Sequence, residues 1–317
     1  HVGILFQPAS ARVEYQPVGV VGIMVPWNYP IFLALGPLTA ALAAGNHAMI
    51  KMSEFTHKTS QLLASLMAKC FPLSLVTVIS GDEKVAQEFS SLPFAHLFFT
   101  GSTQVGRYVM QAAAKNLTPV TLELGGKSPA IIDDKISLDT AVDRLLFGKT
   151  LNAGQTCVAP DYIFCPRDRI DALTAAFKNR FQALFPTIVD NKDYTSIVND
   201  SQYSRLAGLL NNAEEHGAKV TNLACEEHCE QSRKFPLTIL SNVNDDMKVM
   251  QQEIFGPILP IVPYDKVEDA ISYINSHERP LALYICSFNK KFQHSLLKST
   301  ISGGVCINES AFHVAVE

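Results

Sequence analysis

Residues 18–26 read Val-Gly-Val-Val-Gly-Ile-Met-Val-Pro, a run with no charged or polar side chain. A strand with one face in water alternates apolar and polar residues, whereas a strand buried on both faces is apolar throughout. Strands buried on both faces occur in parallel sheets whose two sides are covered by helices. The run therefore predicts a strand inside such a sheet.

The residues that follow alternate between short apolar runs and segments with helical spacing. Leu62, Leu63 and Leu66, for example, recur at intervals that place them on one face of a helix. Alternating strands and helices are typical of a doubly wound parallel sheet, in which ligands lie at the carboxyl ends of the strands. The predicted strands are residues 48–52, 75–80, 95–100 and 120–124, and the predicted helices are residues 30–45, 59–70, 84–90 and 102–115.

A second set of elements follows Gly125 and Gly126, a pair that offers a hinge. We therefore predict two domains, residues 1–123 and residues 124–317, in keeping with roughly 150 residues for each domain. In the second domain, residues 190–203 are polar and predicted to be irregular. The predicted helices are residues 138–152, 169–184, 204–216, 267–276 and 292–299, and the predicted strands are residues 161–165, 234–239, 258–262 and 282–288.

Composition narrows the class of protein. The 317 residues are 47% hydrophobic and 18% charged, which is typical of a globular chain with a sizeable core. A net charge of −4 gives no basic surface for nucleic acid or acidic membranes. The seven cysteines are irregularly spaced, which argues against a disulfide scaffold and predicts a reducing, cytoplasmic compartment.

Two further stretches have alternative interpretations. Residues 31–44 are apolar but shorter than the roughly 20 residues that a bilayer requires, and we predict a buried helix without a membrane span. Residues 225–229, Cys-Glu-Glu-His-Cys, lack a second ligand pair at zinc spacing, so we predict a surface loop and no metal site. No charged and then apolar leader opens the chain, and the sequence is expected to be an excerpt that lacks both ends of a longer protein.

The chemistry points to residues 151–160, Leu-Asn-Ala-Gly-Gln-Thr-Cys-Val-Ala-Pro. A lone cysteine is more often a small buried hydrophobe, but Cys157 lies in a loop rich in small and polar residues. Glu123 ends a predicted strand just before the glycine pair, and Asn28 stands between two prolines. A thiol nucleophile, a carboxylate base and an amide donor are the groups that covalent carbonyl chemistry needs.

Five motifs occur together in a specific order, and with them the chain resembles the aldehyde dehydrogenase superfamily over essentially all its length. They are Pro-Trp-Asn-Tyr-Pro at 26–30, Gly-Ser-Thr-Gln-Val-Gly at 101–106, Glu-Leu-Gly-Gly at 123–126, Gln-Thr-Cys at 155–157 and Glu-Ile-Phe-Gly-Pro at 253–257. The resemblance implies two doubly wound parallel-sheet domains with the active site in the cleft between them. Residues 1–123 would then bind NAD(P) and residues 124–317 would carry the nucleophile.

The resemblance also implies a cofactor site. Ser102 would contact the pyrophosphate, Lys51 and Glu54 the adenosine ribose, Glu253 the nicotinamide ribose, and Phe255 would lie beside the ring. A carboxylate at Glu54 repels a 2′-phosphate, so NAD should be preferred, with NADP tolerated. The alternatives are an ordinary glycine turn at 101–106, a solvated charge pair at Lys51 and Glu54, and simple turn chemistry at 253–257. The full predicted set is Pro26, Trp27, Lys51, Ser53, Glu54, Gly101, Ser102, Gly106, Leu124, Gly125, Glu253 and Phe255.

The implied reaction is aldehyde oxidation through a thiohemiacetal and a thioester on Cys157. Asn28 and the Cys157 backbone N–H would hold the oxyanion, and Glu123 would activate the hydrolytic water. Residues 50–55, Ile-Lys-Met-Ser-Glu-Phe, favour the coniferyl aldehyde dehydrogenase branch over class 3 relatives, which oxidise medium-chain and other aldehydes. The resemblance further implies a homodimer. Two alternatives are an enzyme that transfers the acyl group to coenzyme A and a non-catalytic binding protein on the same fold. Relatives of the first kind lack the base at the position of Glu123, and a protein of the second kind would be expected to lose Cys157 or Glu123.

Overall fold

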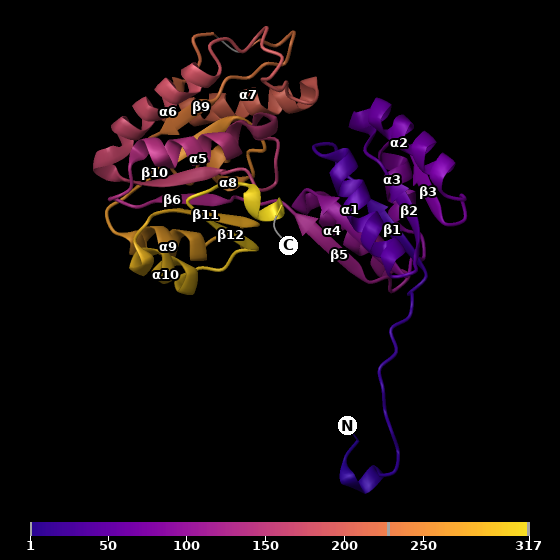
Figure 1. Ribbon diagram of the computed structural model, residues 1–317. Helices are drawn as coiled ribbons and strands as arrows, with labels where there is room; N and C mark the ends of the chain where they lie inside the picture. Colours follow the sequence, from indigo (N-terminus) through magenta and orange to yellow (C-terminus); the bar gives the residue numbers. More distant parts are fainter. Residues whose placement is uncertain (1, 227–228, 316–317) are drawn as a thin grey trace. The chain divides into compact units, whose positions relative to one another are not determined.

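A computed structural model describes residues 2–226 and 229–315, and the chain divides into two compact units, residues 1–123 and 124–317 (Figure 1). Each unit contains its own sheet. The first sheet has five strands in the order β3-β2-β1-β4-β5. The strands are β1 (Val20–Met24), β2 (His47–Lys51), β3 (Val76–Ile79), β4 (His96–Gly101) and β5 (Val120–Leu124), and the α-helices between them are α1 (Pro30–Ala43), α2 (His57–Cys70), α3 (Glu83–Ser90) and α4 (Thr103–Ala114).

The apolar run at residues 18–26 forms β1, the central strand of the first sheet, and β2 and β4 pair with it in parallel. Ile23 on β1, Ile50 on β2 and Leu97 on β4 are fully buried. Strand order reverses direction at β1, because β2 and β3 lie on one side of it and β4 and β5 on the other. In open α/β sheets, the crevice at such a reversal is the usual place for a ligand.

Register aligns the carboxyl ends of these strands. Met24 pairs with Lys51 and with Phe99, and Lys51 pairs with Ile79. The loops after β1, β2, β3 and β4 therefore leave the sheet from one edge.

The second sheet has seven strands in the order β12-β11-β6-β7-β10-β9-β8. Neighbouring strands of this sheet pair in parallel, except for β8 and β9, which pair antiparallel at the sheet edge. Residues of β7 alternate between two cores, since Ile163 packs in one hydrophobic cluster and Phe164 in the other. The bounds are β6 (Pro129–Ile132), β7 (Tyr162–Pro166), β8 (Lys219–Asn222), β9 (Thr238–Ser241), β10 (Ile258–Tyr264), β11 (Ala282–Cys286), β12 (Gly304–Ile307), α5 (Leu138–Thr150), α6 (Ile170–Leu184), α7 (Asp200–Glu215), α8 (Lys248–Gln251), α9 (Val267–Asn275) and α10 (Lys290–Ser299).

The predicted doubly wound α/β architecture is confirmed, with the antiparallel β8 as a departure from a wholly parallel second sheet. The sequence did not predict β6, β8 or β12, because each has only four residues and two of them begin at Pro129 or Gly304, which are poor strand formers. β6 and β12 are fixed by pairing with the longer strands β7 and β11, and β8 is fixed by pairing with β9.

Several predicted boundaries shift for local reasons. The segment predicted to be irregular at 190–203 gives way to α7 at Asp200, because the Asn199 side chain accepts a hydrogen bond from the Gln202 amide at 2.9 Å and caps the helix. The strand predicted at 234–239 is β9 at Thr238–Ser241. The apolar residues 31–44 lie in α1, which buries its Ala34, Leu38 and Ala41 side. Within the described part of the chain, no helix is both long and apolar enough to span a bilayer.

Candidate active site

In the first unit, Asn28 lies in the loop between β1 and α1 and is partly buried. Pro30 is the first residue of α1, where its missing N–H costs no helical hydrogen bond and its fixed φ favours the turn. Asn28 lines a largely apolar groove of about 610 Å³ that runs along α1 past Phe32 and Gly36. A Cβ built on Gly36 would meet no atom within 4 Å, so this glycine leaves the groove open.

Strand β4 ends at Gly101, and Ser102 begins α4 as its N-cap. The Ser102 hydroxyl accepts a hydrogen bond from the Val105 amide at 3.4 Å. A Cβ on Gly101 would come within 2.5 Å of the Phe99 ring, so the close packing of this turn requires glycine. The first amides and the dipole of a 12-residue helix then face the carboxyl edge of the sheet, an arrangement that suits a phosphate group.

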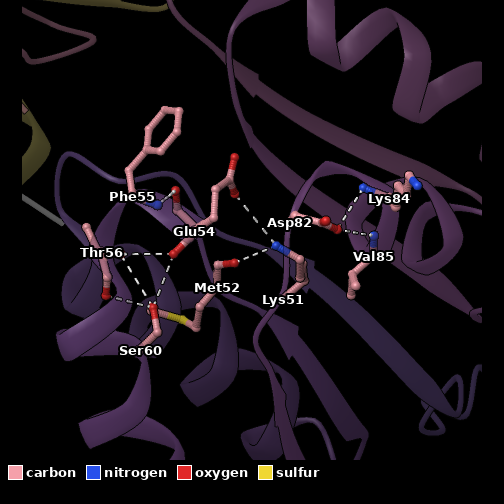
Figure 2. A network of polar contacts seen from close by, with 10 residues as sticks. Lys51, Met52, Glu54, Phe55, Thr56, Ser60, Asp82, Lys84 and Val85 are labelled. Atoms are coloured by element: carbon pink, nitrogen blue, oxygen red, sulfur yellow. Dashed lines mark hydrogen bonds and ion pairs between the residues drawn. The ribbon is translucent and has the colours of Figure 1, made fainter. Parts of the chain in front are cut away.

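Lys51 ends β2 and its side chain is only 3% exposed (Figure 2). Its ammonium donates a hydrogen bond to the Met52 carbonyl at 2.7 Å and lies 3.9 Å from the carboxylate of the half-exposed Glu54. Burial lowers the pKa of Lys51, while Glu54 and Asp82 act to raise it. The alternative of a solvated surface pair is therefore wrong for Lys51, since its charge is held inside the protein.

Two neighbours complete this network. Ser53 uses its hydroxyl locally, accepting a hydrogen bond from the Phe55 amide at 3.3 Å at the start of a short 3-10 helix. Asp82 caps α3 by accepting hydrogen bonds from the Lys84 and Val85 amides (Figure 2). Sequence reasoning missed Asp82, although its position directly after a predicted strand and a glycine was a usable signal.

In the second unit, Cys157 lies between a tight turn and β7, is partly buried and forms no disulfide. The turn Leu151–Gly154 is a 3-10 helix in which Asn152 and Ala153 have left-handed φ values of 51° and 53°. Non-glycine residues in this region carry strain of the order of 1 kcal/mol or more, which surrounding contacts must offset. The predicted helix at 138–152 therefore ends at Thr150, because the chain turns there toward Cys157.

Gln155 supplies such contacts. Its side-chain amide donates to the carbonyls of Asn152 at 2.9 Å and Ser196 at 3.2 Å, and its oxygen accepts from the Val198 amide at 2.9 Å. The left-handed Gly154 packs so closely that a Cβ would lie 2.5 Å from the Gly256 carbonyl oxygen. The loop that carries Cys157 is thus fixed against the segment that carries Glu253.

Glu253 lies over Gly125, another predicted cofactor residue. A Cβ on Gly125 would come within 2.2 Å of the Glu253 carboxylate, so only glycine fits beneath it. Burial, and after it the negative charge of Asp161, raise the pKa of Glu253 to about 7, although a hydrogen bond from the Gly126 amide acts in the opposite direction. Phe255 follows with a left-handed φ of 49°, so this short segment is also conformationally constrained.

Three further predicted residues lie on β5 and α4. Leu124 ends β5, Gly106 is buried on α4, and Glu123 is exposed on β5. Asn28 and Glu123 belong to the first unit and Cys157 to the second, so their joint action in one cleft stays a prediction.

Sequence reasoning missed four charged residues near Glu253. Lys149 is only 1% exposed, and burial lowers its pKa to about 8. Lys127 forms an ion pair with the buried Asp161. Arg205 donates a hydrogen bond to the Ile254 carbonyl at 2.6 Å, and burial lowers its pKa. Their sequence separation gave no signal that they gather around one segment.

None of the seven cysteines, all of which lie in the described part of the chain, forms a disulfide. Within residues 2–226 and 229–315, no three His, Cys, Asp or Glu side chains gather as a metal-binding group. The sequence motif at 225–229 includes positions that lie outside the described residues.

Comparison with solved structures places this architecture in a known class. The chain matches the substrate-bound state of Staphylococcus aureus AldH with a TM-score of 0.93 and 38% identity, over 99% of this chain and 68% of that one. It matches a Mycobacterium tuberculosis aldehyde dehydrogenase complexed with NAD+ with a TM-score of 0.85 and 34% identity, over 93% of this chain and 62% of that one. The fold is that of the aldehyde dehydrogenases.

Sequence comparison gives the family. Residues 5–317 match the model of the aldehyde dehydrogenase family, and the chain belongs to that family. It is 56% identical over 314 residues to a Pseudomonas aeruginosa protein named "Probable coniferyl aldehyde dehydrogenase", covering 99% of this chain and 65% of that protein. The chain thus spans about two thirds of the length of this curated relative.

Proposed function

We propose that the protein oxidises an aldehyde to the carboxylic acid with NAD(P) as hydride acceptor, through a covalent adduct on Cys157. The observation that carries the proposal is the strained loop that presents this thiol, held by Gln155 and packed at Gly154 against the Glu253 segment. A buried structural cysteine needs no such loop. Family membership supports the same reaction.

In this proposal each residue acts on a defined atom. The Cys157 thiolate attacks the carbonyl carbon to form a thiohemiacetal, and the Asn28 amide and the Cys157 backbone N–H stabilise the oxyanion. A nicotinamide held beside Glu253 and Phe255 would supply the hydride acceptor. Glu123 then removes a proton from water as the water attacks the resulting thioester, and the acid leaves with Cys157 restored as a thiol.

The first sheet supports the cofactor part of the proposal. Loops after β1, β2 and β4 carry Asn28, Lys51 and Ser102 at one edge, where the strand order reverses. The glycine turn and helix α4 suit a pyrophosphate, and Lys51 with Glu54 suits ribose hydroxyls. Two carboxylates near this position, Glu54 and Asp82, would repel a 2′-phosphate, so we propose NAD in preference to NADP.

For the substrate we propose an aromatic aldehyde such as coniferaldehyde. The named P. aeruginosa relative supports this class, and so does the open apolar groove beside Asn28. A medium-chain aliphatic aldehyde is the second candidate, since an apolar groove also accepts an alkyl chain. As the resemblance implies, we further propose a cytoplasmic homodimer that does not bind nucleic acid.

The test is NADH formation measured by absorbance with the whole protein and a panel of aldehydes. We expect coniferaldehyde to give a higher kcat/KM than hexanal or acetaldehyde. Filling the groove with Gly36→Leu should lower kcat/KM for coniferaldehyde by about tenfold and leave acetaldehyde nearly unchanged, because a buried clash is felt only by the larger group. No NADH with any aldehyde would refute the proposed reaction, and equal losses for both aldehydes would refute the role of the groove.

A further inference from the structure

We propose that Lys127 and Asp161 form an ion-pair clamp that positions Glu253 and the Cys157 loop as one unit. The inference rests on the proposed function and adds two positioning residues to it. Lys127 follows the glycine pair just before β6, and Asp161 immediately precedes β7, so both lie at the amino edge of the second sheet. Asp161 is 3% exposed and Lys127 is 17% exposed.

The Lys127 ammonium joins two parts of the chain. It contacts the Asp161 carboxylate and also donates hydrogen bonds to the carbonyls of Val249 at 2.7 Å and Gln252 at 3.3 Å. An ammonium has three N–H donors, and these three acceptors occupy them. Lys127 therefore acts on the backbone leading into Glu253, and not as a donor to substrate or cofactor.

Asp161 fixes the other side of Glu253. One carboxylate oxygen takes the ion pair with Lys127, and the other accepts a hydrogen bond from the Ile254 amide at 2.9 Å. The Asp161 amide in turn donates to the Ser128 carbonyl at 2.8 Å, next to Lys127 in the chain. Backbone groups directly before and directly after Glu253 are thus held by the same ion pair.

The clamp also reaches the nucleophile. Asp161 follows Cys157 by a few residues and immediately precedes β7, the strand that anchors the loop, while Gly154 packs against Gly256. A shift of the Glu253 segment would therefore be transmitted to both ends of the Cys157 loop. Mispositioning a catalytic group by about 1 Å can cost on the order of 100-fold in rate.

The test compares Lys127→Met and Asp161→Asn with a control at the opposite edge of the same strands. The control is Arg167→Gln, which breaks an exposed bidentate pair between Arg167, after β7, and Asp265, after β10, with both contacts at 2.9 Å. Four quantities are measured in the whole protein: the dissociation constant for NAD by calorimetry, kcat, amide hydrogen exchange of residues 151–157 and 249–256, and the rate of Cys157 alkylation by iodoacetamide.

We expect each clamp variant to weaken NAD binding about tenfold, to lower kcat by up to about 100-fold, and to speed exchange in both segments, with the control within twofold of the parent. Folded clamp variants that match the parent in NAD affinity, exchange and alkylation would overturn the proposal.

If a single variant does not fold because one buried charge is left unpaired, the double variant Lys127→Met with Asp161→Asn decides. It should show the same losses as a single variant, because the two residues act as a unit, and parental NAD affinity in it overturns the clamp. If the parent binds NAD but oxidises no aldehyde, the proposed function is wrong. The hydrogen exchange and NAD affinity of the clamp variants still test whether the ion pair positions the Glu253 segment.

Discussion

In the first unit the candidate residues follow the strands, whereas in the second unit they precede them. Asn28 and Ser102 come after β1 and β4, and Lys51 is the last residue of β2, so all three lie at the carboxyl edge of the five-stranded sheet. Cys157 and Glu253 come before β7 and β10, at the amino edge of the seven-stranded sheet. Both sheets are doubly wound, yet only the first uses the edge where such folds usually bind ligands.

The carboxyl edge of the second sheet, opposite the edge with Cys157 and Glu253, supports this distinction between the two units. It carries a solvent-exposed cavity of about 670 Å³ lined by Arg167, Tyr264 and Asp265, but none of the residues predicted from the sequence motifs. The first unit builds its site from helix N-termini and loop backbone, which suit a phosphate-bearing ligand. The second builds its site from strained loops held by buried charges, which suit a fixed nucleophile.

The sharpest way to break this comparison is Cys157→Ala. If the amino edge of the second sheet supplies the nucleophile and the first unit binds most of the cofactor, oxidation should fall by at least about 10³-fold while NAD still binds. NADH formation and NAD affinity are measured on the same preparation. Turnover within tenfold of the parent would show that another group is the nucleophile.

Glu123→Gln tests whether the last residue of the first unit serves the thiol of the second. A general base contributes about 10²–10⁴-fold to a step, so hydrolysis of the thioester should slow by that factor while the first NADH is still released as a burst. Mass spectrometry should then find the acyl group on Cys157. A variant with neither burst nor adduct would place Glu123 earlier, in activating the thiol, and unchanged turnover would exclude it as the base.

The raised pKa of Glu253 predicts a pH dependence that the first unit should not share. If ribose hydroxyls donate to the ionised carboxylate, as the resemblance implies, NAD affinity should rise about tenfold from about pH 6 to about pH 8, through the pKa of about 7. Without cofactor the sign reverses for stability: the folded carboxyl keeps its proton above the unfolded pKa, so stability falls as pH rises from about 4.5 through 7. Calorimetry with Glu253→Gln as the matched variant should remove both slopes, and slopes that persist would have to come from another group.

The smallest expected effect concerns the ribose end of the first unit. Glu54→Gln and Asp82→Asn should each raise the ratio of NADP to NAD catalytic efficiency by a few-fold, because exposed charges are partly screened by salt. Glu54 should have the larger effect, since its charge acts more strongly than that of Asp82 on the neighbouring Lys51, and Asn at position 82 keeps the cap of α3. A ratio that does not change in either variant would mean that a different group determines the preference between NAD and NADP at the ribose 2′ position.

Much of the fold and of the candidate site could be predicted from the sequence, because the patterns that indicate them lie in short contiguous segments. Long elements such as α2 and β1 carry their own periodicity, and the residues of the glycine turn, the Cys157 loop and the Glu253 segment are contiguous motifs. The antiparallel β8 and the four-residue strands β6 and β12 could not be predicted, because their conformation is set by pairing with β9, β7 and β11. Short apolar runs have no preference strong enough to decide this alone.

The sequence by itself determined which chemical groups are present, in what order, and that they resemble a family whose members oxidise aldehydes. Only the tertiary structure decided that Lys51 is buried, that Glu253 has a pKa near 7, and that Lys127 and Asp161 hold the Glu253 segment. The physical reason is that burial, pKa and hydrogen-bond partners depend on atoms brought together from distant parts of the chain. Asp161 and Ile254, for example, are 93 residues apart, and no local pattern records their contact.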